Sequence, residues 1–253
     1  MNPYIFASKT MLNLTGNDSP IFIVGCGHSG TSLMLAILDQ HPSIYAVDHE
    51  SYIFHRERLF GKSLKIIVSF IRWRNLCLKA NKRRWAEKTP MHILHLPKIF
   101  SYCPNCRVII MLRDGRDVAC SIKERTGSFE QGVSRWVNDN LAGFPYWNDY
   151  RVKVVKYENL VEYPQTSLRE VCNFLGEEYT EEMLKYDETS RNWYSSNMNA
   201  GSHEKYRNWQ INQPLFDGRK KWEKKINEEE KQIFKEQAQK YMIEFGYEVN
   251  NNW

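Results

Sequence analysis

The chain has 253 residues, 42% of them hydrophobic and 13% aromatic, and a formal net charge of +5. This length suits one large domain with a sizeable core, and we predict a single domain over residues 1–253 with its core at about 20–245. The mild positive charge suits an anionic ligand but gives no reason to expect nucleic acid. The six cysteines are scattered, which is not the pattern of a disulfide-stabilised scaffold.

Targeting signals are not evident in the sequence. No run of about 18 uninterrupted apolar residues occurs, so no membrane-spanning helix is predicted. Residues 1–17 lack the basic start and the long apolar stretch of a signal peptide. We therefore expect a cytoplasmic protein with no indication of membrane association, and the oligomeric state stays open.

Short apolar runs alternate with segments of helical periodicity. Strands are predicted at 21–24, 85–88, 108–112 and 152–157, and helices at 31–40, 115–125, 164–175 and about 227–245. This alternation predicts an α/β fold in which helices cover both faces of a parallel sheet. Ligands of such sheets bind beyond the carboxyl ends of the strands, so polar residues that follow the strands are candidate site residues.

Two segments depart from this alternation. Residues 56–84 form a predicted basic helical insertion, since the stretch from Arg56 to Trp85 holds ten Lys or Arg and one acid, Glu57, among apolar residues. It is interpreted as one or two amphipathic helices with a solvated basic face, or as a surface that attracts an acidic acceptor or a membrane. The polar and aromatic stretch 191–221 is predicted to be a long loop.

The first chemical motif is the loop after the first strand, from Gly25 to Ser32. Its glycines let several backbone N–H groups point at one anion, and the helix that follows adds the positive end of its dipole. An ATP-binding P-loop would carry a lysine directly after its last glycine, and here Thr31 follows Gly30. The loop therefore predicts a phosphate or sulfate site, with a plain glycine turn as the alternative.

The second motif follows the strand 108–112. Arg113 stands at the end of this strand, and Ser121 and Arg125 share one face of the next helix. Two guanidinium groups and a hydroxyl that converge would hold a second phosphate through charge-assisted hydrogen bonds. The alternative is a surface ladder of ion pairs with Asp114 and Asp117.

Together these motifs resemble the superfamily of sulfotransferases that use PAPS (3′-phosphoadenosine 5′-phosphosulfate). The resemblance spans residues 21–222 and is nearest in spacing to the tyrosylprotein and bacterial type. Besides the loop and the Arg113–Arg125 unit, it is carried by Tyr157-Glu-Asn-Leu-Val, Pro164, Phe174-Leu-Gly and Lys221-Trp. It implies a P-loop-like α/β fold and sulfuryl transfer from PAPS, with PAP as the product, to a small-molecule, glycan or peptide acceptor.

The resemblance also implies roles for individual residues. It places the 5′-phosphosulfate on the loop, the 3′-phosphate on the second motif and the adenine near Tyr157, with Lys221 as a further donor-binding residue. The implied donor-binding residues are Gly27, His28, Ser29, Gly30, Thr31, Ser32, Arg113, Ser121, Arg125, Tyr157 and Lys221.

The implied catalytic residues are Glu50, His28, Lys88 and Ser202. Glu50 fits the family's catalytic base best, with Asp48 and His49 as alternatives. Lys88, within Glu87-Lys88-Thr89-Pro90, resembles the family's lysine that faces the sulfuryl group. His28 departs from the family, which carries Arg or Lys there, so its charge would depend on protonation near neutral pH.

No metal is expected. His92 and His95 lack a carboxylate at ligand spacing, and the CxxC formed by Cys103 and Cys106 lacks a second pair and is predicted to be a turn. A P-loop kinase and a non-catalytic nucleotide-binding member of the fold remain the alternative functions.

Overall fold

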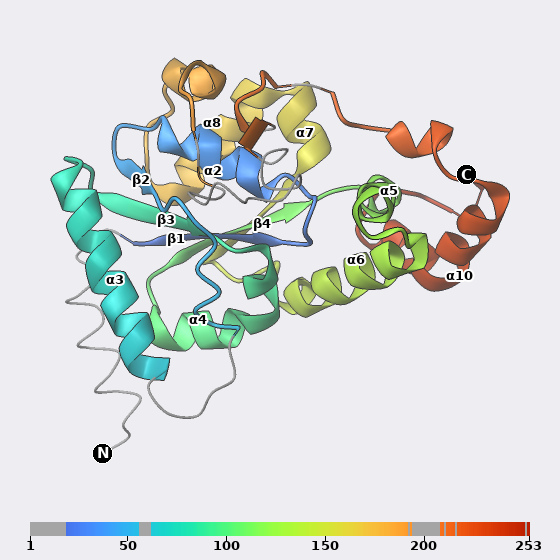
Figure 1. Ribbon diagram of the computed structural model, residues 1–253, viewed down its shortest axis with the longest axis horizontal. Coiled ribbons are helices and arrows are strands. Elements are labelled where there is room, and N and C mark those ends of the chain that lie inside the picture. Colours follow the sequence, from blue (N-terminus) through green and yellow to red (C-terminus); the bar gives the residue numbers. More distant parts are fainter. Residues whose placement is uncertain are drawn as a thin grey trace.

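The computed structural model describes residues 19–55, 62–191, 193, 208–209, 211–215, 217–250 and 252–253. Five parallel strands form one sheet in the order β2-β3-β1-β4-β5 (Figure 1). The strands are β1 (Ile21–Gly25), β2 (Ile44–Ala46), β3 (Arg84–Lys88), β4 (Arg107–Leu112) and β5 (Val152–Lys156). The predicted parallel α/β sheet is confirmed, and β2 is a strand that the sequence pattern does not predict.

The helices match the predicted segments closely and add others. They are α2 (Thr31–Asp39), α3 (Lys62–Lys79), α4 (Leu96–Tyr102), α5 (Gly115–Thr126), α6 (Phe129–Gly143), α7 (Tyr157–Glu162), α8 (Pro164–Leu175) and α10 (Glu228–Glu244). Short 3₁₀ segments lie at Pro90–His95, Phe144–Tyr146, Glu181–Glu188 and Lys221–Lys224. Asn227 begins α10 as predicted, because its side chain and that of Glu230 cap each other's backbone N–H groups.

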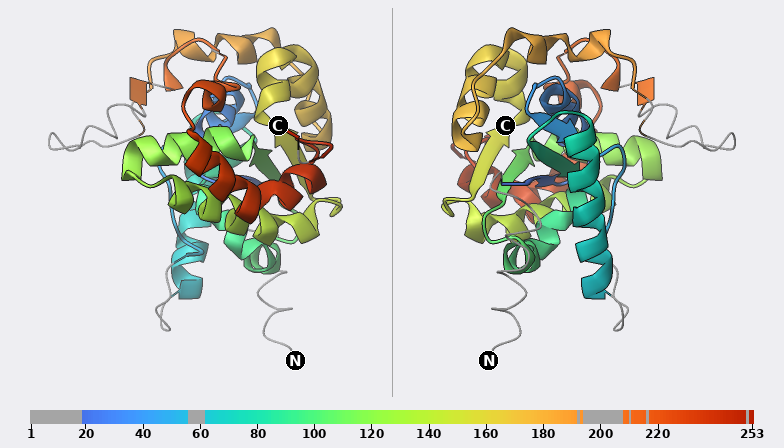
Figure 2. Two further views of the ribbon diagram at one scale, coloured as in Figure 1. Left: turned by 90° about the vertical axis from the view of Figure 1, so that its right-hand side faces the viewer. Right: turned by 90° about the vertical axis from the view of Figure 1, so that its left-hand side faces the viewer.

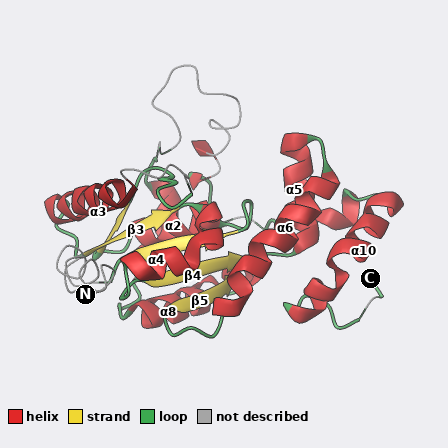
Figure 3. Ribbon diagram, turned by 90° about the horizontal axis from the view of Figure 1, so that it is seen from below, coloured by secondary structure: helices red, strands yellow, loops and turns green. Residues whose placement is uncertain are grey.

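Successive residues of each strand face opposite sides of the sheet. Ile21 and Ile23 pack with the buried sides of α2 and α8, whereas Phe22 and Val24 pack with α3 and α4. Figures 1 and 3 show these helices on opposite faces of the sheet. The near-continuous burial of β1 and β4 is what a parallel sheet covered on both faces requires.

A third apolar cluster lies beyond the carboxyl end of β4. It joins α5, α6 and α10 around Val118, Trp136 and Phe234, and Figure 2 shows these helices grouped in front of the sheet. Trp136 donates from its indole nitrogen to the Arg113 carbonyl oxygen at 2.9 Å. The cluster therefore fixes the backbone at Arg113, the first residue of the second motif.

The structure describes only part of the two segments that depart from the alternation of strands and helices. Of the basic insertion, the structure describes the helix α3, which contacts the edge strand β2 and its neighbour β3. The predicted catalytic Ser202 lies outside the described residues. Within the described part of the chain, no helix combines the length and apolar character needed to cross a membrane.

Candidate active site

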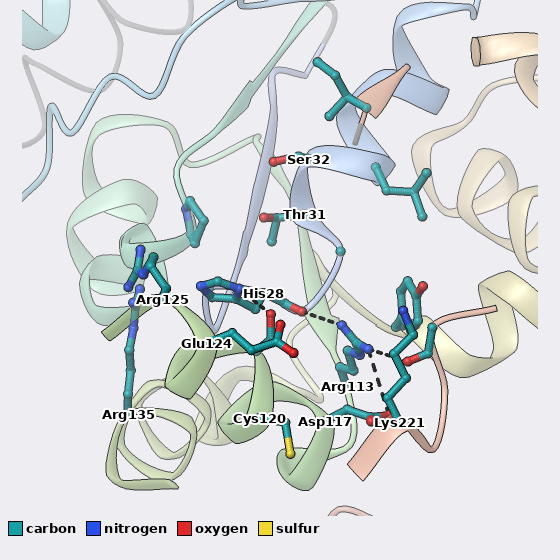
Figure 4. Close-up of a pocket in the computed structure, with 18 of the residues that line it drawn as sticks. His28, Thr31, Ser32, Arg113, Asp117, Cys120, Glu124, Arg125, Arg135 and Lys221 are labelled. Atoms are coloured by element: carbon teal, nitrogen blue, oxygen red, sulfur yellow. Dashed lines mark hydrogen bonds and ion pairs between the residues drawn. The ribbon is translucent and has the colours of Figure 1, made fainter. Parts of the chain in front are cut away.

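A cavity of about 620 Å³ opens where β1 and β4 end (Figure 4). Gly25 of β1 lies beside Met111 of β4, so the loop after β1 and Arg113 leave the sheet from neighbouring strand ends. Most of the predicted donor-binding residues line this cavity: Gly27, His28, Gly30, Thr31, Ser32, Arg113, Ser121, Arg125, Tyr157 and Lys221. The cavity thus lies where open parallel sheets bind ligands.

The loop between β1 and α2 is shaped as an anion cradle. Gly30 begins α2 with a φ of 89°, and no side chain caps the first N–H groups of the helix. A Cβ at Gly30 would lie 2.8 Å from the Tyr157 ring, so only glycine fits there without displacing the ring. The Ser29 side chain is fully buried and has no hydrogen-bond partner among the described residues. Uncapped N–H groups at a helix start and the positive dipole end suit a phosphate or sulfate group.

His28 connects the loop to α5. It has a left-handed φ of 72°, and its Nδ1 lies 2.8 Å from the Ser121 hydroxyl oxygen. Arg113 Nη1 donates to the His28 carbonyl oxygen at 3.0 Å. His28 therefore contacts two residues of the predicted 3′-phosphate motif, Ser121 through its imidazole and Arg113 through its backbone carbonyl.

Arg113 is held by contacts on several sides. Its Nη2 donates to the Gly218 carbonyl oxygen at 2.6 Å, and its guanidinium stacks 4.5 Å from the centroid of the Tyr157 ring. A Cβ at Gly218 would lie 2.7 Å from the Tyr157 hydroxyl oxygen. These contacts fix a planar cation at the cavity wall, in the geometry that suits a phosphate oxygen.

Asp117 fixes the segment that carries Lys221. Its carboxylate accepts hydrogen bonds from the backbone N–H groups of Lys220 at 2.9 Å and Trp222 at 3.0 Å. Burial raises the pKa of Asp117, and the nearby Arg113 cation opposes this shift. Both hydrogen bonds favour the ionised form of Asp117. The segment with Lys221 is therefore held by a negative charge that the Arg113 cation partly balances.

Glu50 and Lys88 form an ion pair at the other end of the cavity. Lys88 Nζ donates to Glu50 Oε1 at 2.5 Å, and the Tyr52 hydroxyl donates to Glu50 Oε2. Glu50 and Tyr52 line the cavity, whereas Lys88, with a side chain 2% exposed, reaches Glu50 from behind. The alternatives Asp48 and His49 pair with each other at 2.8 Å and are absent from the cavity lining, which favours Glu50 as the base.

A buried carboxylate supports the segment next to Glu50. Glu87, fully buried, accepts hydrogen bonds from the Ser51 N–H at 3.2 Å and the Ser51 hydroxyl at 2.8 Å. Thr89 Oγ1 also donates to it at 2.5 Å, and His92 Nδ1 lies 3.1 Å away. Burial alone would raise the pKa of Glu87, but the charge of His92 and these hydrogen bonds outweigh it and lower the pKa.

Comparison with known proteins agrees with this geometry. A family described as "Sulfotransferase family" matches residues 68–181. The Drosophila melanogaster protein-tyrosine sulfotransferase is 26% identical over 199 residues, which cover 66% of this chain and 40% of that protein.

Two solved structures share the fold. The sulfotransferase domain of the Synechococcus PCC 7002 olefin synthase matches with a TM-score of 0.59 at 17% identity, covering 88% of this chain and 96% of that one. Mouse sulfotransferase SULT7A1, solved with PAP, has a TM-score of 0.59 at 17% identity, covering 94% and 90%.

The family match over residues 68–181 and the similar protein-tyrosine sulfotransferase support the PAPS-dependent sulfotransferase superfamily for this chain. In this sulfotransferase, the structure brings together most of the residues that the resemblance implies. Arg113 and Arg125 line one cavity but lie on opposite sides of His28, with Arg125 beside Arg135 (Figure 4). The convergence of the two guanidinium groups on one phosphate stays a prediction. Ser29 and Lys88 do not line the cavity, although both belong to elements that border it.

Several residues of the site have no counterpart among the predicted ones. Arg135 of α6 lines the cavity, and its guanidinium lies so close to Gly27 that a Cβ there would be 2.8 Å from Nη2. The carboxylates of Asp117 and Glu87 position neighbouring segments rather than the ligand. Since these contacts join residues far apart in the sequence, local patterns give no signal for them. Tyr52 is the exception, because it is an aromatic residue only two positions after the predicted base Glu50 and could have been suggested on that ground.

In the described part of the chain, no group of three or more His, Cys, Asp or Glu side chains is arranged to hold a metal. His92 binds Glu87, and His95 Nε2 lies 3.3 Å from His55 Nδ1. Cys103 and Cys106 form the predicted turn and are unpaired thiols.

Proposed function

We propose that this sulfotransferase moves a sulfuryl group from PAPS to a hydroxyl or amine of its acceptor, with Glu50 as the general base. The observation that carries the proposal is the single cavity that joins the uncapped α2 start and Arg113 to the Glu50–Lys88 pair. A bisphosphate nucleotide needs two anion sites. Transfer of its sulfuryl group also needs a base, so the two anion sites and the base must share one cavity. The fit of the loop to an anion is supported by the room that Gly30 leaves beside the Tyr157 ring.

The donor would be held by both motifs. The N–H groups of the loop, with Thr31 and Ser32, take the 5′-phosphosulfate, and Arg113, Ser121 and Arg125 take the 3′-phosphate. Tyr157, stacked with Arg113, and Lys221 complete the donor side. Gly27 gives the loop the close approach to Arg135 that brings a further cation to the cavity.

The reaction is an in-line displacement at sulfur. The acceptor oxygen or nitrogen forms a bond to sulfur while the bond from sulfur to the 5′-phosphate oxygen breaks, and PAP leaves. Glu50 takes the acceptor proton, and the loop N–H groups and His28 stabilise the charge that develops on the sulfuryl and leaving oxygens. Lys88 positions the Glu50 carboxylate through the ion pair at Glu50 Oε1.

The acceptor side of the cavity is mixed in character. Tyr52, which donates to Glu50, lines the cavity together with Pro90, Met91 and Leu33, so a ring or chain can pack against these apolar surfaces. Because a similar protein is named as a protein-tyrosine sulfotransferase, a phenol is the first acceptor class to test. Hydroxyls of glycans and small molecules are the other classes.

A product assay tests the proposal. Purified protein is incubated with PAPS and panels of tyrosine peptides, phenols and glycans, and mass spectrometry measures PAP and sulfated acceptor. Stoichiometric formation of both, absent with Glu50→Gln, is the expected result. Formation of sulfated acceptor at an unchanged rate by Glu50→Gln would remove Glu50 as base. The cytoplasmic location and the single-domain organisation stay predictions from the sequence.

A further inference from the structure

The helix α3 is fixed against the sheet edge by one of its faces. Ile66, Phe70, Trp73 and Cys77 are buried there, and the Trp73 ring lies 4.9 Å from the ring of Trp85 in β3. Their spacing of four, three and four residues places them on one side of the helix. This packing determines which residues α3 presents outward.

The outward face of α3 is apolar instead of polar. Leu64 is 65% exposed, Val68 54%, Ile71 37% and Leu78 55%. At about 100° per residue these four side chains form one stripe on the side opposite the buried residues. A helix on the surface of a globular protein normally presents polar residues there, and a contiguous exposed apolar stripe marks an interaction site.

Positive charge accompanies this stripe. Lys65, Arg72 and Lys79 are exposed, and each directly follows a residue of the stripe, so they lie along one of its borders. Arg74 lies at the other border. The sequence from Lys62 to Lys79 contains no Asp or Glu. The exposed Asn75 also lies within the stripe, so the outward face is mostly apolar in the middle and cationic at its borders.

We propose that the outward face of α3 docks this protein on an anionic phospholipid membrane surface. The apolar stripe would lie at the boundary between headgroups and acyl chains, and the Lys and Arg stems would extend to the anionic headgroups. A second copy fits this face less well, since its own Lys and Arg would meet like charges. The stripe also covers only about two heptads, fewer than the three or four typical of a coiled coil.

Vesicle co-sedimentation tests this surface with the full-length protein. Wild-type protein should bind phosphatidylcholine vesicles that contain phosphatidylserine and not pure phosphatidylcholine vesicles. The variant Lys65→Gln/Arg72→Gln/Lys79→Gln should lose roughly 100-fold in affinity, because each basic residue near an anionic surface contributes about fivefold. Leu64→Gln/Val68→Gln/Leu78→Gln should lose binding as well, whereas an electrostatic attraction alone would survive in that variant.

A matched control removes the same charge elsewhere. Lys185→Gln/Lys224→Gln/Lys240→Gln changes exposed lysines outside α3 and should retain vesicle binding. Equal losses in the control and the α3 charge variant would overturn the proposal, and so would a wild-type protein that ignores phosphatidylserine. A concentration-dependent dimer in sedimentation velocity, lost with the apolar variant and without vesicle binding, would assign the stripe to a second copy instead. Unchanged PAP binding in all variants shows that they are folded and separates this test from the proposed activity.

Discussion

Lys88 Nζ lies 2.5 Å from Glu50 Oε1, although the two residues are 38 positions apart in the chain. The lysine side chain is 2% exposed and that of Glu50 10% exposed, so the pair is shielded on the protein side and open on the cavity side. A carboxylate positioned by a buried lysine, and facing a ligand cavity, is an arrangement suited to proton transfer.

Replacement of Glu50 tests the base directly. Glu50→Gln should lower kcat by about 10²- to 10⁴-fold, the usual contribution of general base catalysis, and leave PAP affinity unchanged. Steady-state kinetics and calorimetric PAP binding measure the two effects. Asp48→Asn is the matched control, because the Asp48 side chain is 71% exposed and pairs with His49 outside the cavity. A larger loss in Asp48→Asn than in Glu50→Gln would move the base to that pair.

A substitution at Gly30 tests anion binding by the loop without removing a charge. Gly30→Ala should weaken PAP binding by at least about tenfold, because the new methyl would displace the Tyr157 ring and with it the stacked Arg113. Gly176→Ala is the control, since Gly176 has a similar positive φ of 73° and nothing within 4 Å of a built Cβ. Both variants carry a backbone strain of roughly 1–2 kcal/mol, seen as a lower Tm. Equal PAP affinity in the two variants would argue against the cradle.

Asp117 tests the positioning of the Lys221 segment. Asp117→Ala removes the acceptor of the Lys220 and Trp222 N–H groups, so PAP should bind more weakly while acceptor KM changes little. Asp149→Ala, which removes a comparable Asp–Arg pair with Arg151 outside the cavity lining, should leave both constants unchanged. If PAP affinity is retained in Asp117→Ala, the segment is held by other contacts.

Glu87 gives a pH-dependent signature. The folded protein lowers the pKa of Glu87, so the unfolded chain binds the proton more tightly. The resulting stability is fully present above the unfolded value of about 4.5 and is lost as pH falls through the lower folded pKa. Glu87→Gln should be about 1–3 kcal/mol less stable at neutral pH, because a charged acceptor of several buried donors is lost.

Urea unfolding between pH 3 and 7 measures that signature. The free energy of unfolding of wild type should rise with pH more steeply in the acidic range than that of Glu87→Gln. Identical pH slopes in the two proteins would show that Glu87 does not titrate as the structure requires.

The sequence predicts the central strands because β1 and β4 are short apolar runs that end at glycine or arginine. It also predicts α2, α5, α8 and α10, whose apolar spacing and caps are local properties. It misses β2, which has three residues, and α6, although Phe129, Val133, Trp136 and Asn140 recur at helical spacing after the N-cap Ser128. The first is too short for a periodic signal.

The pairing of Glu50 with Lys88 depends on that missed strand. β2 and β3 are parallel neighbours, with Ala46 beside Ala86, so the residues that follow their carboxyl ends meet. A motif comparison places both residues at the site, but only the strand order joins them. The same holds for Ser51 and Glu87, and for Asp117 and Trp222, whose contacts span 36 and 105 positions.

The central claim is that the cavity is built for a 3′-phosphorylated adenine nucleotide as the sulfuryl donor. Isothermal titration of the wild-type protein with PAP and with AMP, without magnesium, measures the contribution of the 3′-phosphate, and ATP with magnesium serves as the competing nucleotide. PAP should bind at least about 100-fold more tightly than AMP, since charge-assisted hydrogen bonds to a phosphate contribute about 1.5–3 kcal/mol each. Equal affinities for PAP and AMP, or tighter binding of ATP with magnesium, would contradict the account.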